Sequence, residues 1–210
     1  MFQITRSSIS MKKDEVVLKS EFAKQVADLY HDMEEAYDQT AKALDFSCSG
    51  CPDNCCDSYF LHHTYTEWAY LWQGLKTMEG SQLQAITEKA AKYVIESEAA
   101  LARGKRPIIM CPLNTDGLCS LYSYRLMICR LHGLPATFTR PDGQKLDFPG
   151  CFRCQEHISR DNSVAPLDRT QFFRGLVKLE IELLAQRRMT APKVKLTIAQ
   201  MIVKGPPTLT

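Results

Sequence analysis

Apolar residues recur at intervals of three and four along much of the chain, a spacing typical of helices with one buried face. The first such stretch runs from 14 to 44, and acidic and basic residues fill its other face. Its apolar stripe consists of Phe22, Val26, Leu29, Met33, Tyr37 and Leu44. This pattern predicts a long amphipathic helix. Residues 1–11 precede it, and we expect them to form a flexible N-terminus.

Two further helices are predicted in the next third of the chain. The motif Thr64-Tyr-Thr-Glu67 has the form of a capping box and would begin a helix over 65–79. Gly80 would end that helix. The motif Ser81-Gln-Leu-Gln84 repeats the capping signature at the start of a helix over 82–103. We expect the two helices to pack together as a helical hairpin.

Short apolar stretches and turn residues replace the helical pattern after residue 105. Residues 106–113 predict a strand, and Asn114-Thr-Asp-Gly117 predicts the turn that follows it. Residues 119–124 would return as the second strand of a small β-hairpin. A short helix is expected over 125–132. Residues 136–167 are predicted to be rich in loops.

Two last helical patterns complete the chain. The motif Asp168-Arg-Thr-Gln171 would cap a long helix over about 168–186. Residues 196–203 predict a further turn of helix that packs back onto the rest. The fold class expected from all these patterns is mainly α with a small β-hairpin.

Charge and terminal sequence narrow the class of protein. The net charge of +2 over 210 residues is too small to indicate a nucleic-acid or membrane partner. The sequence has no run of about 18 uncharged apolar residues, and its start lacks the order of a secretory signal peptide. We therefore expect a cytoplasmic protein in a reducing compartment, and its protein partner, if it has one, stays unknown.

Nine cysteines are the most distinctive feature of the chain. They are Cys48, Cys51, Cys55, Cys56, Cys111, Cys119, Cys129, Cys151 and Cys154. In a reducing compartment such a set is more typical of metal or redox chemistry than of disulfides. Zinc and four-iron clusters each commonly take four thiolates, so nine thiols are enough for two sites with one to spare. The expected fold is thus a helical scaffold that holds irregular metal-binding loops, in a single domain over 12–210 with a cysteine-cluster core at about 46–155.

The spacing leaves the pairing of the thiols open. Cys55 and Cys56 are adjacent, so their side chains tend to diverge. They would serve one multinuclear cluster, or two neighbouring centres, more easily than one zinc ion. The two Cys-x-x-Cys motifs, Cys48-x-x-Cys51 and Cys151-x-x-Cys154, could instead form a pair of zinc knuckles.

Two arginines stand close to the third cysteine segment. Arg125 and Arg130 lie within four residues of Cys129. A cluster held by four thiolates carries negative charge, so guanidinium groups around it would stabilise it and raise its reduction potential. Cys119 and Cys129 would lie about 15 Å apart if the whole segment were helical, and a strand that leads into a short helix would relax this limit.

The order of the motifs resembles a known family. Cys48-x2-Cys51-x3-Cys55-Cys56, Cys111-Pro112, Cys119-Ser-Leu-Tyr122 and Arg125-x3-Cys129-Arg130 follow one another. This order is similar to the zinc- or iron-chelating domain family, the CxxCxxCC or YkgJ-type cysteine-cluster proteins, over about residues 46–155. The family typically has a proline where this chain has Leu126. The resemblance implies that the seven cysteines before residue 130 are ligands and that Cys151 or Cys154 supplies the last one.

Three hypotheses for the function follow. The first is an iron–sulfur protein, most simply of the 4Fe–4S type, with a redox or cluster-dependent role. The second is a zinc-stabilised structural or interaction module. The third is a cluster-dependent modifying enzyme such as a protein methyltransferase, because a similar domain occurs in flagellin lysine methylases. The chain has no Gly-x-Gly-x-x-Gly stretch for an adenosyl cofactor, and the sequence identifies no catalytic residue.

Overall fold

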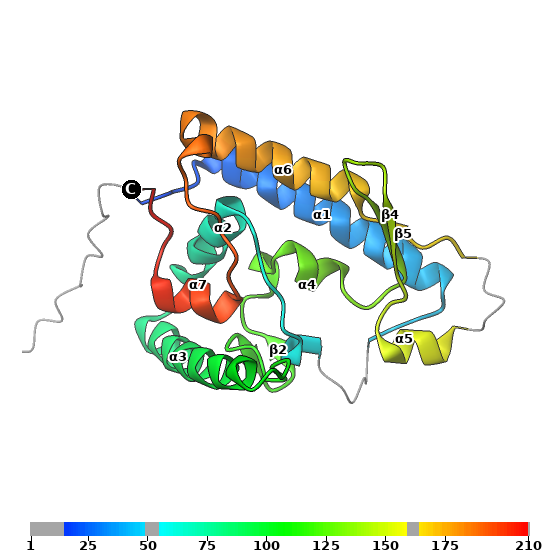
Figure 1. Ribbon diagram of the computed structural model, residues 1–210, viewed down its shortest axis with the longest axis horizontal. Coiled ribbons are helices and arrows are strands. Elements are labelled where there is room, and N and C mark those ends of the chain that lie inside the picture. The colour runs from blue at the N-terminus through cyan, green and yellow to red at the C-terminus, as the bar shows by residue number, and fades with distance from the viewer. Residues whose placement is uncertain (1–14, 49–54, 159–163, 210) are drawn as a thin grey trace, which may run out of the picture.

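The computed structural model describes residues 15–48, 55–158 and 164–209, and within them the fold is mainly α-helical with small β elements (Figure 1). This confirms the predicted fold class; the predicted flexible N-terminus lies outside the described residues. The longer helices are α1 Ser20–Ala43, α2 Tyr65–Leu75, α3 Gly80–Ala102 and α6 Thr170–Leu184. The shorter helices are α4 Met127–Leu131, α5 Phe152–His157 and α7 Ile198–Lys204. Single turns of 3₁₀-helix are η1 Cys55–Asp57, η2 Tyr122–Tyr124 and η3 Ala185–Met189.

The described strands form two small sheets. β1 Asn114–Thr115 pairs antiparallel with β2 Leu118–Cys119, with Asn114 opposite Cys119. The second sheet has the order β4-β3-β5 and contains β4 Lys145–Phe148, β3 Ala136–Thr139 and β5 Leu167–Asp168. β3 is antiparallel to β4 and parallel to β5.

A first core lies where α1 and α6 run side by side, with α2 and α4 packed against them (Figure 1). Val26, Tyr30 and Met33 of α1 are completely or almost completely buried in it. The Tyr30 ring meets the Tyr70 ring of α2 edge-on, with 5.2 Å between centroids. The burial of Val26 and Met33 confirms the apolar stripe predicted for this helix.

A second core lies between α2, α3 and α7. Leu71 and Leu75 of α2 are completely buried there, as is Met201 of α7. The indole N–H groups of Trp68 and Trp72 donate to the Met201 carbonyl oxygen at 3.1 and 3.0 Å, which fixes α7 against α2. The expected helical hairpin is therefore wrong, because α3 packs chiefly against α7 and α2 chiefly against α6.

The segment between α3 and α5 is held by both cores. Leu113, Leu121 and Leu126 are buried in the second core, and Met127 and Leu131 are buried in the first. Burying one such side chain contributes about 1.5–3 kcal/mol. Apolar packing therefore anchors the stretch 121–131, which leads to and contains Cys129, on both cores.

Caps define the helix starts, some as predicted and some not. Thr64 caps α2, and its Oγ1 accepts the Glu67 N–H at 3.1 Å. Thr197 caps α7 in a full capping box with Gln200, within the predicted 196–203 turn. The cap predicted at Ser81 is wrong, since α3 begins at Gly80, two residues before the predicted start, and has no side-chain cap. Gly80 therefore does not end the preceding helix, because α2 already ends at Leu75.

Two of the remaining elements begin or end away from their predicted places. α1 begins at Ser20 rather than 14, because the preceding residues pair with the other end of the chain: the Val16 N–H donates to the Pro207 carbonyl at 2.8 Å. α6 begins at Thr170 and ends at Leu184, and the Asp168 carboxylate accepts the Thr170 N–H at 2.9 Å.

The β elements differ more from the sequence-based predictions than the helices do. A small hairpin is present, but neither predicted strand is right: 106–113 is not a strand, and Asn114 belongs to β1 rather than to the turn. Of the predicted strand 119–124 only Cys119 lies in a strand, because Tyr122–Tyr124 forms η2. Asp116 and Gly117 both have positive φ, 51° and 86°, as a two-residue hairpin turn requires. The region predicted as loops, 136–167, contains the sheet around β3 and the helix α5. The strands of this sheet are short. β3 pairs with β5, which lies far from it along the chain, and no local sequence pattern indicates this pairing.

Candidate metal centre

Four cysteines from four separate segments around β2 and α4 lie close enough for the charge of one to act on another. Cys56 lies in η1, Cys119 in β2 and Cys129 in α4, while Cys111 precedes the hairpin. The Cys111 N–H donates to the Cys56 carbonyl oxygen at 2.9 Å. The Asn114 N–H donates to the Cys111 carbonyl at 2.9 Å, and Asn114 stands opposite Cys119. Backbone hydrogen bonds therefore tie three of these four residues together. We call Cys56, Cys111, Cys119 and Cys129 the first thiol group.

The electrostatics of these thiols reflect their proximity. Burial raises the pKa of Cys111 to about 12, and the charges of Cys56 and Cys119 add to the increase. Burial also raises the pKa of Cys129, and the charges of Cys111, Cys119 and Cys56 add to it in turn. Burial raises the pKa of Cys119 as well, with a further increase from Cys56. Cys56, Cys111 and Cys119 thus each oppose the ionisation of another member of the group, a repulsion that a bound cation would relieve.

The pKa values of the two adjacent cysteines, Cys55 and Cys56, are shifted in opposite directions. The pKa of Cys56 is lowered to about 6, first by a hydrogen bond from the Cys55 thiol and then by the Asn114 amide and the Arg125 charge. The pKa of Cys55 is raised by the same hydrogen bond and by burial, and the charges of Cys56, Cys48 and Cys129 add to it. Cys55 therefore stands between the first thiol group and Cys48.

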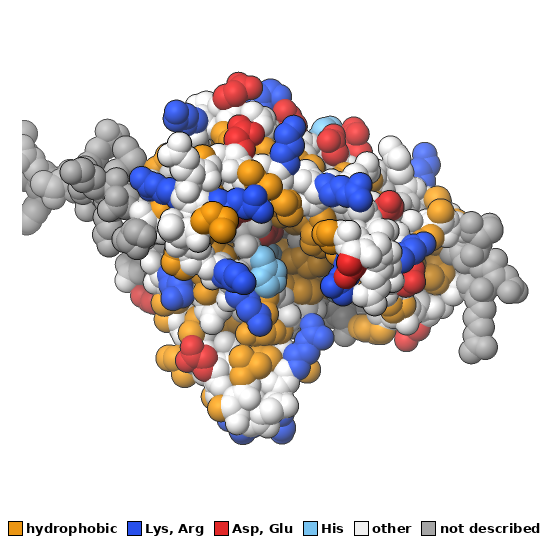
Figure 2. All heavy atoms as spheres, turned by 45° about the horizontal axis from the view of Figure 1, so that its top comes forward, with side chains coloured by type: hydrophobic (Ala, Val, Ile, Leu, Met, Phe, Trp, Pro, Cys, Tyr) orange, Lys and Arg blue, Asp and Glu red, His pale blue; other side chains and the backbone are white. Residues whose placement is uncertain are grey.

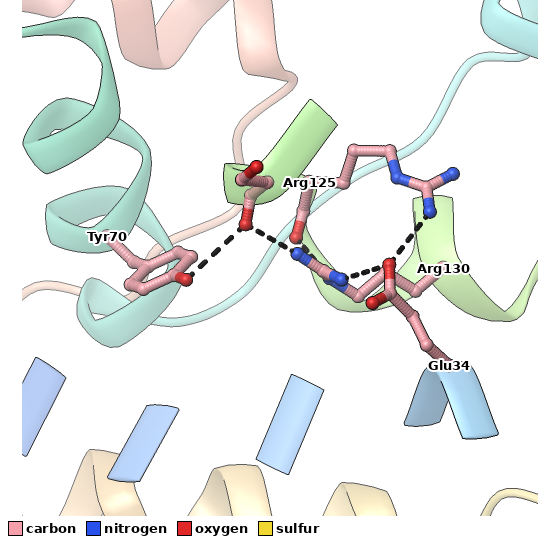
Figure 3. Close-up of polar contacts among 5 residues, drawn as sticks. Glu34, Tyr70, Arg125 and Arg130 are labelled. Carbon is pink, nitrogen blue, oxygen red and sulfur yellow. Dashed lines mark hydrogen bonds and ion pairs between the residues drawn. The ribbon is translucent and has the colours of Figure 1, made fainter. Parts of the chain in front are cut away.

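Two arginines, Arg125 and Arg130, act on thiols of the first group, and Figure 3 shows how the two side chains are held. The Glu34 carboxylate of α1 lies 3.0 Å from Nη2 of Arg125 and 2.5 Å from Nη1 of Arg130. Arg130 also donates to the carbonyl oxygens of Arg125 and Ser123, each at 2.8 Å. The Arg125 guanidinium stacks over the Tyr122 ring at 3.6 Å.

The two predicted arginines have different parts in this arrangement. The charge of Arg125 lowers the pKa values of Cys56, Cys119 and Cys129, so it acts on the thiols directly. Arg130 is buried and uses its donors to hold the turn between Cys119 and Cys129. Its direct effect on the thiols is a smaller lowering at Cys119.

Two buried N–H donors lie near the first thiol group, and one of them, the Asn114 amide, acts on the Cys56 thiol. Nδ2 of Asn114 and Nε of Arg125 have no oxygen or nitrogen atom within hydrogen-bonding geometry among the described residues. Asn114 lies beside the Cys56 thiol, whose pKa it lowers. N–H groups that point at sulfur are the usual means by which a protein tunes a metal–thiolate site. A set of four thiols with the Asn114 amide beside Cys56 therefore fits a thiophilic metal or cluster.

Besides Cys55, three described cysteines lie outside the first thiol group, and we call Cys48, Cys151 and Cys154 the second thiol group. The Cys154 N–H donates to the Cys151 sulfur at 3.4 Å, across the start of α5. Burial raises the pKa of Cys154 to about 11, and the charges of Cys151 and Cys48 add to it. The Tyr37 hydroxyl of α1 lies 3.7 Å from the Cys48 sulfur. Segments from both halves of the chain thus meet here too.

Seven of the predicted ligands are therefore divided between two groups, and Cys55 interacts with members of both. Cys51 lies outside the described residues. Among the described residues, no three His, Cys, Asp or Glu side chains already stand in the arrangement of a metal-ion site. Sequence reasoning missed Glu34, Asn114 and Tyr37. Only Asn114 had a local signal, as a turn residue, and that signal concerned the backbone and not the thiols.

The distribution of side chains over the surface adds little evidence for or against the candidate metal centre. The face drawn in Figure 2 carries both basic and acidic side chains, and apolar side chains line a hollow near its centre. Over the described residues, none of the helices has the length and apolar character needed to cross a membrane.

No protein-family model, no curated protein and no solved structure matches this chain. The resemblance to the cysteine-cluster family consequently stays a prediction based on the motifs alone.

Proposed function

We propose that this chain is a metal–thiolate protein that holds an iron–sulfur cluster of the 4Fe–4S type on the first thiol group, in a redox or cluster-dependent role. The observation that carries the proposal is the meeting of Cys56, Cys111, Cys119 and Cys129 from four separate segments. A four-iron cluster commonly takes four cysteine thiolates.

The surroundings of the four thiols support a negatively charged occupant. Arg125 places a guanidinium close to three of them, and Asn114 offers a buried N–H beside Cys56. Positive charge and hydrogen bonds to sulfur raise the reduction potential of such a cluster. When bound, the cluster would supply one-electron chemistry. The chain itself contributes the ligands, the counter-charge and the rigid turn that Arg130 holds.

The test is the colour and content of the full chain purified without air. The protein is expected to be brown and to contain about four iron atoms and about four acid-labile sulfides per chain. The double variant Cys119→Ser/Cys129→Ser should lose both while its far-UV circular dichroism keeps the helical signal. Colourless wild-type protein fully occupied by zinc would overturn the proposal and favour the zinc-stabilised module instead.

A further inference from the structure

We propose that Cys151 and Cys154 form a reversible dithiol–disulfide couple that undergoes thiol–disulfide exchange with a small disulfide of the glutathione class. The proposed function assigns the cluster to four other thiols, so this couple does not depend on it. Figure 1 shows α5, which carries Cys154, apart from β2, which carries Cys119 of the first thiol group. The observation that carries the inference is a direct contact between the two residues, since the Cys154 N–H donates to the Cys151 sulfur at 3.4 Å.

The turn that carries the two thiols, Cys151-Phe-Arg-Cys154, has the Cys-x-x-Cys spacing of disulfide oxidoreductases. Cys151 directly precedes α5, and its carbonyl oxygen accepts the Gln155 N–H at 3.0 Å, so the turn is helical. Residues three positions apart in such a turn have Cα atoms about 5 Å apart. This separation lies within the range of about 4.4–6.8 Å that disulfides span. Both residues are free thiols in the structure, which is the reduced form of the couple.

The backbone on both sides holds the turn in place. The Cys151 N–H donates to the Gly133 carbonyl oxygen at 2.9 Å. A Cβ atom on Gly150 would lie 2.7 Å from the same oxygen, and Gly150 has a φ of +87°, so only glycine allows this close approach without strain. The Gln155 side-chain amide donates to the Gly150 carbonyl oxygen at 2.9 Å. We therefore expect the backbone to keep the two cysteines together in both the reduced and the oxidised form.

The two thiols differ in their access to solvent. Cys151 is half-buried, whereas Cys154 is completely buried in a cluster with Leu44 and Leu134. Phe152, the residue that follows Cys151, is 53% exposed, so this side of the turn faces solvent. A small disulfide can therefore reach Cys151 but not Cys154. This assigns Cys151 as the attacking thiol and Cys154 as the thiol that resolves the mixed disulfide.

The exchange takes place in two steps. The Cys151 thiolate attacks one sulfur of oxidised glutathione, a mixed disulfide forms, and one glutathione leaves as a thiolate. Cys154 then loses its proton and attacks the Cys151 sulfur, which forms the Cys151–Cys154 disulfide and releases the second glutathione. The two protein thiols lose two electrons and two protons in total, and one glutathione disulfide is reduced to two glutathione thiols. The reverse sequence restores the dithiol when reduced glutathione is in excess.

The test is incubation of the full chain, purified without air, with oxidised glutathione, followed by alkylation of the free thiols in denaturant and mass spectrometry. The wild type is expected to form a disulfide between Cys151 and Cys154. Cys154→Ala should instead accumulate glutathione on Cys151 about tenfold or more above the wild type, because the resolving thiol is missing. Cys48→Ser, which changes the third member of the second thiol group, is the matched control and should still form the disulfide. A wild-type disulfide between Cys48 and Cys151, or no adduct on Cys151 in folded Cys154→Ala, would overturn the inference.

A second measurement uses the wild type alone and covers the case in which Cys154→Ala does not fold. Over a series of ratios of reduced to oxidised glutathione, Cys151 and Cys154 should become protected from alkylation together, because a two-electron couple oxidises both thiols in one transition. Oxidation of Cys151 while Cys154 stays a free thiol, or no protection of either, would contradict the couple. The iron–sulfur proposal fails on a different result, the absence of iron and labile sulfide from protein purified without air, so the two failures are distinguishable.

Discussion

Glu34 of α1 lies 2.5 Å from Nη1 of Arg130, and this ion pair joins the longest helix to the cysteine-bearing segment. The Arg130 side chain is almost completely buried, whereas Glu34 is 34% exposed. Through its other donors Arg130 holds the backbone of Ser123 and Arg125 (Figure 3). The pair therefore fixes the turn that separates Cys119 from Cys129.

Glu34→Gln is expected to lower the free energy of unfolding by about 1–3 kcal/mol, because it leaves the charge of Arg130 buried without its partner. Urea denaturation followed by circular dichroism measures this. The matched control is Glu35→Gln on the same helix, whose partner His31 lies 3.3 Å away in an exposed pair. That variant should change stability by less than about 0.5 kcal/mol. Equal losses in the two variants would contradict a special role for Glu34.

Arg125→Gln is expected to lower the reduction potential of the proposed cluster by about 50 mV, since a nearby positive charge favours the reduced form by about 1 kcal/mol. A redox titration followed by electron paramagnetic resonance measures the potential. Arg140→Gln is the control, because Arg140 forms an exposed pair with Asp142 at 2.8 Å. An Arg125 variant with the potential of the wild type would show that this charge does not act on the cluster.

Gly74 of α2 allows the close approach of Tyr124, the last residue of η2. A Cβ atom at Gly74 would lie 2.4 Å from Cγ of the Tyr124 ring. Gly74→Ala should therefore push η2 away and destabilise the protein by about 1–3 kcal/mol in thermal or urea denaturation. Gly80→Ala is the control, because no atom of the described residues lies within 4 Å of the place its Cβ atom would take. Alanine there should be neutral or slightly stabilising, so a loss at Gly80 equal to that at Gly74 would refute the steric explanation.

Glu67 makes the stability of the protein depend on pH. It is buried beside His62 Nδ1 at 3.2 Å and accepts the Thr64 hydroxyl at 2.9 Å. Burial alone would raise the pKa of Glu67, but the charge and hydrogen bond of His62, with further hydrogen bonds from Thr64 and the Met127 backbone, bring it below its usual 4.5. A depressed folded pKa contributes stability that is present above pH 4.5 and lost as the pH falls through the folded value.

Glu67→Gln should accordingly be less stable than the wild type at pH 7 by about 1–3 kcal/mol, and this difference should shrink below pH 4.5. Urea denaturation at a series of pH values gives both quantities. The exposed Glu88→Gln provides the control, with no change of slope expected. A constant difference between wild type and Glu67→Gln down to about pH 3 would count against this linkage.

The helices could largely be predicted because their signals are local. Val26 and Met33 recur at the helical period and are buried, and Thr64 caps α2 as its motif indicates. Features that depend on distant partners could not be predicted. The carboxylate of Glu180 accepts the N–H groups of Tyr65 and Thr66 at 2.8 and 2.9 Å, and no pattern near either residue announces this contact.

In the candidate site, too, local features could be predicted and features that depend on distant partners could not. Cysteine content alone indicated thiolate chemistry, and the adjacency of Cys55 and Cys56 suggested that two centres could be neighbours. Which thiols share a centre depends on long-range packing, such as the hydrogen bond between Cys111 and Cys56. Packing also decides where α4 begins. Leu126 is completely buried in the second core, and α4 begins directly after it, although the family that the motifs resemble usually has a proline at this position.

Removal of the proposed metal centre should loosen only part of the cysteine-bearing chain. The hairpin β1–β2 has two residues in each strand, and Leu118 in it is 74% exposed. A hairpin of this size is not stable by itself in water. By contrast, Leu121 and Leu126 anchor the next stretch in the second core. After anaerobic treatment with a chelator, amide hydrogen exchange should therefore rise at 111–120 while 121–131 and α1 stay protected.

The Cys119→Ser/Cys129→Ser variant is the control for this measurement, because the first thiol group cannot form in it and the chelator should leave exchange at 111–120 unchanged. The wild type without metal and the variant should then exchange at similar rates in the hairpin. If exchange rose equally over α1 and α6, the metal would be holding the whole helical scaffold. Such a result would mean that the two apolar cores do not place the thiols on their own.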